Sequence, residues 1–219
     1  MQKKNGSPKS KKTVVYESLK KRIITNILKP GEPLNEIELS KELKISKTPV
    51  REALQQLEKE GFVENVPGKG SFVSQFSLQD IRDLFEMREV IECAVIRRVA
   101  AKADFDMANA RLICDKFKSS DTDKNSTQKT HINAGDQIHT FFFEAFGNRK
   151  LLEHYRALQE QIVRMRHALL GQVDAERAEA SYQEHLETIE AVMAKDPDRA
   201  ERAMRNHLQN SVDYIRKII

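Results

Sequence analysis

Apolar residues recur every three or four positions over most of the chain, the spacing that places them on one face of an α-helix. In the first third, this spacing starts at Thr13 and stops at Pro30–Gly31. A short second helix follows Asn35, and a third is expected over about 47–60, behind the capping residue Ser46. The pattern therefore predicts three helices before residue 61.

Two short stretches of strand-forming residues, 62–66 and 71–76, come after the third helix. Residues 67–70 between them, Pro-Gly-Lys-Gly, are typical of a turn. The two stretches therefore predict a β-hairpin with a four-residue loop. Three helices followed by such a hairpin is the order of elements in a winged helix-turn-helix.

From Leu78 onward the helical spacing continues with almost no strand signal. Residues 118–130 are polar and of low complexity and predict a loop. The expected helices cover about 78–102, 104–117, 133–146, 148–170, 174–195 and 197–217. The fold class is thus mainly α, with a winged helix-turn-helix carrying a small β-hairpin wing, followed by an all-α bundle of about six helices. The expected division is a disordered basic arm (1–12), a winged helix-turn-helix domain (13–76) and a helical domain (77–219).

Charge separates the two parts of the chain. The 219 residues hold 37 Lys plus Arg and 33 Asp plus Glu, a formal charge of +4. Residues 1–75 hold 15 basic and 9 acidic residues, a net of +6, which leaves −2 for the remainder. This asymmetry favours an anionic partner for the first part only.

Composition excludes several classes of protein. No apolar run approaches the roughly 18–20 residues that span a bilayer, and the Lys-rich N-terminus is not followed by the apolar region of a secretory signal. The two cysteines, Cys93 and Cys114, form neither a disulfide framework nor a zinc motif. We expect buried, reduced thiols in a cytoplasmic protein with no membrane partner.

The third helix has two faces of different chemistry. Val50, Ala53, Leu54 and Leu57 fall on one arc and form the expected core face. Another arc of the helix and the wing turn carry cationic, hydrogen-bonding and small residues suited to DNA edges and phosphates: Lys47, Thr48, Arg51, Gln55, Lys69 and Gly70. The alternative is an ordinary solvated helix face, and the helix-turn-helix-wing order favours the DNA-binding interpretation.

This part of the chain resembles the DNA-binding domain of the GntR family of bacterial transcription regulators. The resemblance rests on Val15-Tyr16-Glu17-Ser18-Leu19, Pro30-Gly31-Glu32, Leu34-Asn35-Glu36 and Ser46-Lys47-Thr48-Pro49-Val50-Arg51-Glu52-Ala53-Leu54. It implies that Ser46, Lys47, Thr48 and Arg51 lie at the operator, with Lys69 and Gly70 from the wing. The family usually has Arg where this chain has Lys47, which keeps the charge and loses the planar fork. The resemblance also implies a homodimer on a double-stranded, (pseudo)palindromic operator.

The second part is similar to the all-helical ligand-binding (FCD-like) domain of the FadR-type branch of that family. The segments concerned are Arg88-Glu89-Val90-Ile91-Glu92, His139 with Asn148, Glu184-His185 and Ala203-Met204-Arg205-Asn206-His207-Leu208. The resemblance implies an effector-binding and dimerisation domain with a divalent metal, zinc or nickel, held by Asp136, His139, His185 and His207. It further implies that Arg88 pairs with the carboxylate of a small organic-acid effector.

One departure bears on this metal site. The family's Asp lies four residues before the first His, and that position is Gly135 here, while Asp136 lies three before His139. Three alternatives follow: Asp136 reaches the ion from the same helix face, three His bind it alone, or the site is lost. Arg88 could instead form a structural ion pair with a neighbouring Glu. His139 could instead be a histidine packed at the edge of the core.

The function expected from these features is a sequence-specific DNA-binding transcription regulator rather than an enzyme. A small organic acid in the C-terminal domain would modulate operator binding, with a bound divalent metal taking part. The competing reading is a metal-dependent hydrolase that uses the same His cluster. The chain has no His-Glu-x-x-His motif, no Gly-rich phosphate loop and no nucleophile elbow, which disfavours it.

Overall fold

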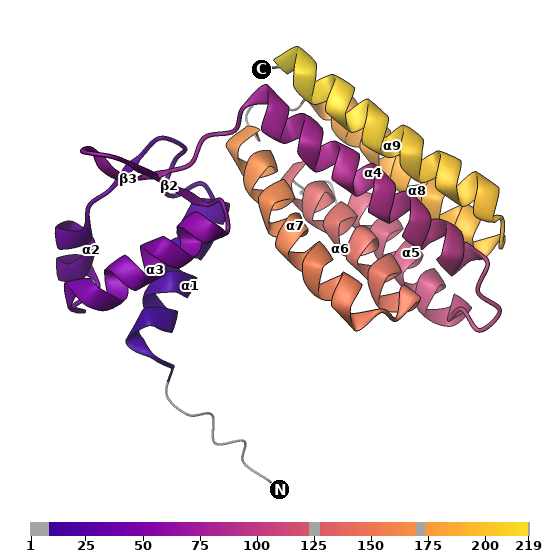
Figure 1. The fold of residues 1–219 in the computed structure, drawn as a ribbon. Helices are drawn as coiled ribbons and strands as arrows, with labels where there is room; N and C mark the ends of the chain where they lie inside the picture. Colours follow the sequence, from indigo (N-terminus) through magenta and orange to yellow (C-terminus); the bar gives the residue numbers. More distant parts are fainter. Residues whose placement is uncertain (1–8, 123–127, 170–173, 219) are drawn as a thin grey trace, which may run out of the picture. The chain divides into compact units, whose positions relative to one another are not determined.

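The computed structural model describes residues 9–122, 128–169 and 174–218. The chain divides into two compact units, Met1–Phe76 with Val163–Ala168 and Ser77–Ile162 with Leu169–Ile219. Most of the predicted basic arm, residues 1–8, lies outside the described residues. In the part that is described, the protein is mainly α, as expected, with one small antiparallel sheet in the first unit (Figure 1).

Three helices open the first unit: α1 (Lys11–Ile24), α2 (Glu36–Glu42) and α3 (Lys47–Lys59). The prediction that the arm extends to residue 12 is wrong, because Ser10 caps α1 by accepting a hydrogen bond from the Thr13 amide. α1 also ends earlier than predicted. Asn26 has a φ of 57°, a left-handed conformation that Asn tolerates and that a continuing helix does not contain.

The core of the first unit lies between α1 and α3. The four predicted apolar residues of α3, Val50, Ala53, Leu54 and Leu57, are all buried, together with Val15, Leu19 and Ile23 of α1. This packing leaves the opposite face of α3 at the surface. A helix with one buried stripe is held in place by its apolar contacts, so its polar face is presented in a fixed orientation.

The sheet has three strands, β1 (Pro33–Leu34), β2 (Val63–Val66) and β3 (Gly70–Val73), in the order β1-β3-β2. The predicted hairpin is present, with Val63 opposite Val73. Its loop is shorter than the four residues predicted, because Gly70 already pairs with Val66 and only 67–69 connect the strands. β1 was missed because it is two residues long and forms only by antiparallel pairing with β3. A strand of two residues is too short to show the alternation of apolar and polar residues that indicates a strand.

The second unit is all helical, with the predicted six helices: α4 (Leu78–Ala100), α5 (Met107–Thr122), α6 (Gln128–Phe146), α7 (Arg149–Leu169), α8 (Ala175–Met193) and α9 (Pro197–Ile218). α4 begins with a reciprocal capping box between Ser77 and Asp80. The predicted loop over 118–130 is too long. α5 extends to Thr122 and α6 begins at Gln128, because a polar sequence can still form the backbone hydrogen bonds of a helix. Residues 123–127 lie outside the described part.

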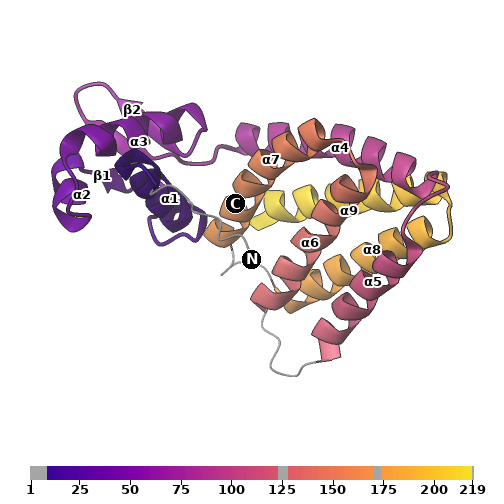
Figure 2. The same ribbon diagram turned by 90° about the horizontal axis from the view of Figure 1, so that it is seen from below.

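The helices of the second unit pack with their buried faces toward one another (Figure 2). α4 and α8 both contact α9, and α6 contacts α4, α5 and α8. Phe143 of α6 stacks on Tyr155 of α7 with ring centroids 3.7 Å apart. This arrangement places the inner faces of α4, α6, α8 and α9 around one common interior.

Both cysteines are buried free thiols, as predicted. Burial raises the pKa of Cys93 to about 12, so this thiol stays protonated at neutral pH. No helix in the described ranges is long and apolar enough to cross a membrane.

Candidate functional site

A cleft of about 410 Å³ lies between α2, α3 and the hairpin of the first unit. Four of the residues predicted to bind DNA line it: Arg51, Gln55, Lys69 and Gly70. Gly68 and Gly70 have φ values of 76° and 99°, which make the tight turn at the tip of the wing possible. The cleft therefore joins the exposed face of α3 to the wing.

The other three predicted DNA-binding residues lie at the start of α3. Ser46 is its N-cap residue, yet its side chain makes no capping hydrogen bond. Lys47 and Thr48 follow in the first turn, and all three are exposed. All seven residues predicted at the operator are thus on the surface of the same unit, where helix and wing form a surface of mixed cationic and hydrogen-bonding character.

Arg51 has a partner that the sequence did not suggest. Its Nε donates to Oε1 of Glu36 at 2.9 Å, and its Nη2 donates to Oε2 at 2.8 Å. The hydrogen bond from Arg51 lowers the pKa of Glu36. The two residues are fifteen positions apart on different helices, so no spacing rule could have paired them.

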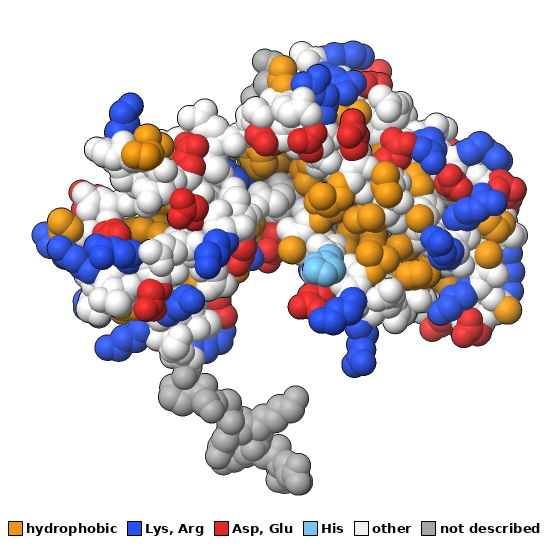
Figure 3. All heavy atoms as spheres, in the orientation of Figure 1, with side chains coloured by type: hydrophobic (Ala, Val, Ile, Leu, Met, Phe, Trp, Pro, Cys, Tyr) orange, Lys and Arg blue, Asp and Glu red, His pale blue; other side chains and the backbone are white. Residues whose placement is uncertain are grey.

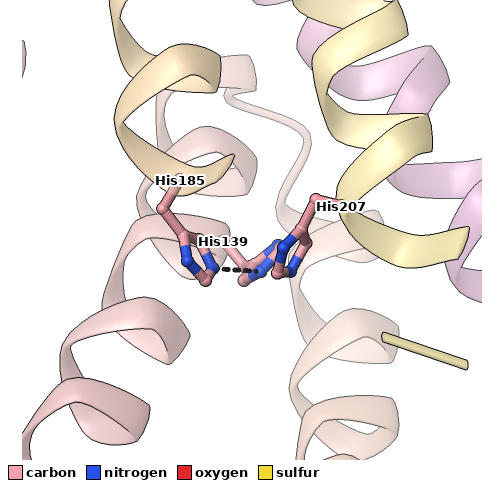
Figure 4. A group of neighbouring side chains, drawn as sticks. All are labelled: His139, His185 and His207. Atoms are coloured by element: carbon pink, nitrogen blue, oxygen red, sulfur yellow. Dashed lines mark hydrogen bonds between the residues drawn. The ribbon is translucent and has the colours of Figure 1, made fainter. Parts of the chain in front are cut away.

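Three histidines predicted as metal ligands meet in the interior of the second unit. His139 of α6, His185 of α8 and His207 of α9 point toward one another (Figure 4). One ring nitrogen of each lies within 4.8 Å of the others, and all three side chains are buried. Nε2 of His139 is 3.1 Å from Nε2 of His185, and Nε2 of His207 has no hydrogen-bond partner among the described residues.

The outer nitrogen of each ring faces an acceptor. Nδ1 of His185 is 2.6 Å from the Ser181 carbonyl, and Nδ1 of His207 is 2.8 Å from a Glu184 carboxylate oxygen. Nδ1 of His139 lies 2.6 Å from Oε2 of Glu92, close enough for an ion pair although the atoms are not aligned as a hydrogen bond. Because carbonyls and carboxylates only accept, the contacts of His185 and His207 favour a proton on Nδ1, while the 3.1 Å contact between the Nε2 atoms of His139 and His185 is a hydrogen bond only if one of them is protonated. The three Nε2 atoms then face one another, an arrangement that could hold a metal ion.

Electrostatics keep the His207 ring in the neutral form that can act as a ligand. Burial lowers the pKa of His207 to about 4, so the ring is neutral at pH 7. Burial alone would raise the pKa of Glu184, but hydrogen bonds from His207 and Arg177 lower it to about 2. An ionised Glu184 therefore orients a neutral His207, as outer carboxylates commonly do for metal-binding histidines.

Asp136, the fourth predicted ligand, is buried but is not part of the group of donors within 4.8 Å. Its backbone carbonyl accepts from the side chains of Thr140 and Gln159. The neighbouring Gly135 is in contact with the site instead. A Cβ at this position would lie 2.9 Å from Cε1 of His185, so the imidazole occupies the space that a side chain at 135 would need. The structure thus brings three of the four predicted ligands together.

Arg88, the predicted effector anchor, is 1% exposed. Its Nε donates to Oε1 of Glu92 at 2.7 Å, which is the ion pair considered as the alternative role. Its Nη1 and Nη2, however, are buried with no hydrogen-bond partner among the described residues. Burial would raise the pKa of Glu92, but Arg88 and then His139 hold it well below its usual range. Glu92 therefore links the arginine to the histidine group.

Comparisons with known proteins agree with this organisation. Residues 11–73 match the family model described as bacterial regulatory proteins, gntR family, and residues 83–210 match the FCD domain. The HTH-type transcriptional repressor RspR of Escherichia coli (strain K12) is 26% identical over 212 residues, covering 93% of this chain and 88% of that protein. The Nta operon transcriptional regulator of Aminobacter aminovorans is 29% identical over 198 residues, covering 87% and 88%.

Solved structures show the same fold. A transcriptional regulator GntR from Rhodococcus sp. RHA1 superposes with a TM-score of 0.77 at 23% identity, covering 96% of this chain and all of that one. Escherichia coli McbR/YncC superposes with a TM-score of 0.73 at 20% identity, covering 96% and 99%. With the two domain matches together spanning most of its length, the chain belongs to the GntR family of transcription regulators and carries an FCD domain behind its winged helix-turn-helix.

Proposed function

We propose that the chain is a cytoplasmic regulator whose binding to a (pseudo)palindromic operator is modulated by a small organic acid. The seven surface residues of the first unit would contact the duplex, and the interior of the second unit would hold the effector beside a divalent metal. One observation carries the effector part: three converging imidazole lone pairs and a buried, half-unpaired guanidinium belong to the same interior. Without bound partners, both features would be costly.

The histidine group fits a zinc or nickel ion. Three buried imidazoles suit either metal, and the Nε2 of His207, which has no partner among the described residues, is the kind of buried atom that a metal satisfies. When bound, the ion would supply a Lewis acid with coordination positions left for a carboxylate. Of the alternatives left by Gly135, we favour three His ligands, since Asp136 lies outside the donor group.

Arg88 fits a carboxylate-bearing ligand. Its Nη1 and Nη2 form the planar edge that binds a carboxylate with two hydrogen bonds. Glu92 already neutralises part of its charge, so a single further carboxylate suits the site better than a strongly charged anion. The ligand would shift the balance between two arrangements of the DNA-binding units in proportion to its difference in affinity for them.

A homodimer fits the surface of α4. Val90 and Met87 are 72% and 54% exposed, and with Ala94 they lie on one face of the helix. Hydrophobic side chains gather over this part of the second unit (Figure 3). Glu86 precedes the apolar residues and Arg98 follows them, both exposed, so two α4 helices packed antiparallel would pair opposite charges.

The hydrolase alternative receives no support. The similar proteins are named as transcription regulators, and neither match is to an enzyme family. We therefore assign the histidine group to ligand and metal binding rather than to turnover.

Arg51→Ala should abolish specific operator binding, because it removes the cationic fork from the exposed face of α3. An operator can be selected from a random duplex pool by the unaltered chain, and affinities measured by fluorescence anisotropy. Lys59→Ala, at the other end of the same helix, is the control and should bind normally. Unchanged specific affinity of the Arg51 variant, with its circular dichroism also unchanged, would remove Arg51 from the interface.

Protein purified without chelator or His-tag should contain about one zinc or nickel per chain by elemental analysis. His185→Ala should lose the ion, and Gly135→Ala should weaken its binding because the new Cβ displaces the His185 ring. His154→Ala, an exposed histidine of α7, should retain it. Full metal content in the His185 variant would show that the ion lies elsewhere.

Arg88→Lys should weaken carboxylate binding at least about tenfold, since lysine keeps the charge beside Glu92 and loses the planar fork. Acetate, lactate, malonate and citrate are the probes, and the rise in Tm of the metal-loaded chain is the readout. Arg82→Lys, an exposed arginine of α4, serves as the control. Equal stabilisation of both variants would argue against Arg88 as the anchor.

Val90→Glu should convert the dimer to monomer at micromolar concentration, because it places a charge in the centre of the proposed interface. Sedimentation velocity measures the change. Leu112→Glu introduces the same charge on α5, at a residue 52% exposed, and should leave the dimer intact. A monomeric unaltered chain, or two equally dimeric variants, would place the interface elsewhere.

A further inference from the structure

We infer that Glu36 is a positioning residue for operator recognition, which orients the Arg51 guanidinium to read a guanine in the major groove. The inference rests on the proposed function, because it takes Arg51 to lie at the operator. Glu36 belongs to α2, whereas Arg51 belongs to α3, whose exposed face carries the predicted base contacts. The effect of Glu36 would be on discrimination between base pairs rather than on affinity alone.

The geometry of the pair leaves one edge of the guanidinium available. A guanidinium has five N–H donors, and Glu36 takes one from Nε and one from Nη2. The remaining three are both hydrogens of Nη1 and one of Nη2. Nη1 and Nη2 together form the edge that can donate two parallel hydrogen bonds to O6 and N7 of guanine. The ion pair and the base contact are therefore compatible in one orientation of Arg51.

The exposed fractions of the two side chains differ in the direction that this base contact requires. The Arg51 side chain is 62% exposed, whereas that of Glu36 is 29% exposed. The carboxylate is thus the more buried partner, and most of the Arg51 side chain stays accessible to a duplex. An arginine held in this way has lost part of its rotamer freedom before DNA arrives, which lowers the entropic cost of the base contact.

The charge of Glu36 adds a second effect. Its pKa is lowered, first by the hydrogen bond from Arg51 and with a smaller contribution from Lys47, so the carboxylate is ionised at neutral pH. A fixed negative charge beside the two cations reduces their general attraction to phosphate. A duplex without a guanine at Arg51 therefore binds through a weaker phosphate attraction and forms no base contact that would offset the loss. Glu36 therefore penalises incorrect sequences as well as supporting the correct contact.

The position of Glu36 also has a structural role that the experiment must separate. Glu36 is the first residue of α2, after the N-cap Asn35, where a carboxylate is favourable to the helix dipole. Glu38 lies in the same first turn, is exposed, and forms no ion pair with any described residue. Glu38→Gln therefore makes the same charge change at the same helix end without touching Arg51.

The test compares the full-length chain with its Glu36→Gln and Glu38→Gln variants. The unaltered chain first selects an operator from a random duplex pool. Anisotropy at one fixed ionic strength then gives affinities for that operator, for each of its single base-pair replacements and for a scrambled duplex. We expect Glu36→Gln to lose about tenfold in discrimination at one G·C pair of each half-site, with equal or higher affinity for the scrambled duplex. Glu38→Gln should match the unaltered chain.

Two results would overturn the inference while leaving the proposed function in place. One is that Glu36→Gln keeps the same preference at every base pair. The other is that it weakens all duplexes equally, as a destabilised α2 would. If instead the unaltered chain selected no sequence from the pool, the proposed function itself would fail, and the inference with it.

Discussion

Three imidazole lone pairs that face one another in a buried interior are the constraint around which the helical unit is arranged. The outer nitrogens of His139, His185 and His207 face a carboxylate, a backbone carbonyl and a second carboxylate, and this sets the tautomers. The inner Nε2 atom of a ring with its proton on Nδ1 has a free lone pair, which can accept a hydrogen bond or bind a cation. Helices α6, α8 and α9 each contribute one ring, so a single ligand would connect all three.

Arg88 and Glu92 extend this group to α4. A buried pair of opposite charges is weak evidence for stability, because desolvation offsets much of the attraction. Here the pair is also incomplete, since two guanidinium nitrogens have no partner in the part of the chain that the structure describes. The structural role of Arg88 is thus present, with one nitrogen bonded to Glu92, and the proposed ligand would use the other two. Glu92 in turn places a negative charge beside His139.

In the DNA-binding unit, by contrast, an apolar core supports a polar surface. The buried stripe of α3 holds the helix, and the cleft between α3 and the wing gathers Arg51, Gln55, Lys69 and Gly70. Two acidic residues, Glu36 and Glu58, line the same cleft. Of these, Glu36 is paired with Arg51, which is the basis of its proposed role in orientation and discrimination.

Local patterns were sufficient for most of the fold. Helical spacing indicated every helix, and the turn residues 67–70 indicated the hairpin, because periodicity and turn chemistry are properties of neighbouring residues. Six of the seven surface residues followed from the polar arc of the third helix and from the wing turn, whereas Ser46 and the three histidines came only from the family resemblance, since their spacing contains no local chelating motif. Strand β1, the Glu36–Arg51 pair and the contact of Gly135 with His185 join residues that are distant in the chain. The packing of whole elements sets the distances between such residues, so the periodicity of the sequence could not predict these contacts.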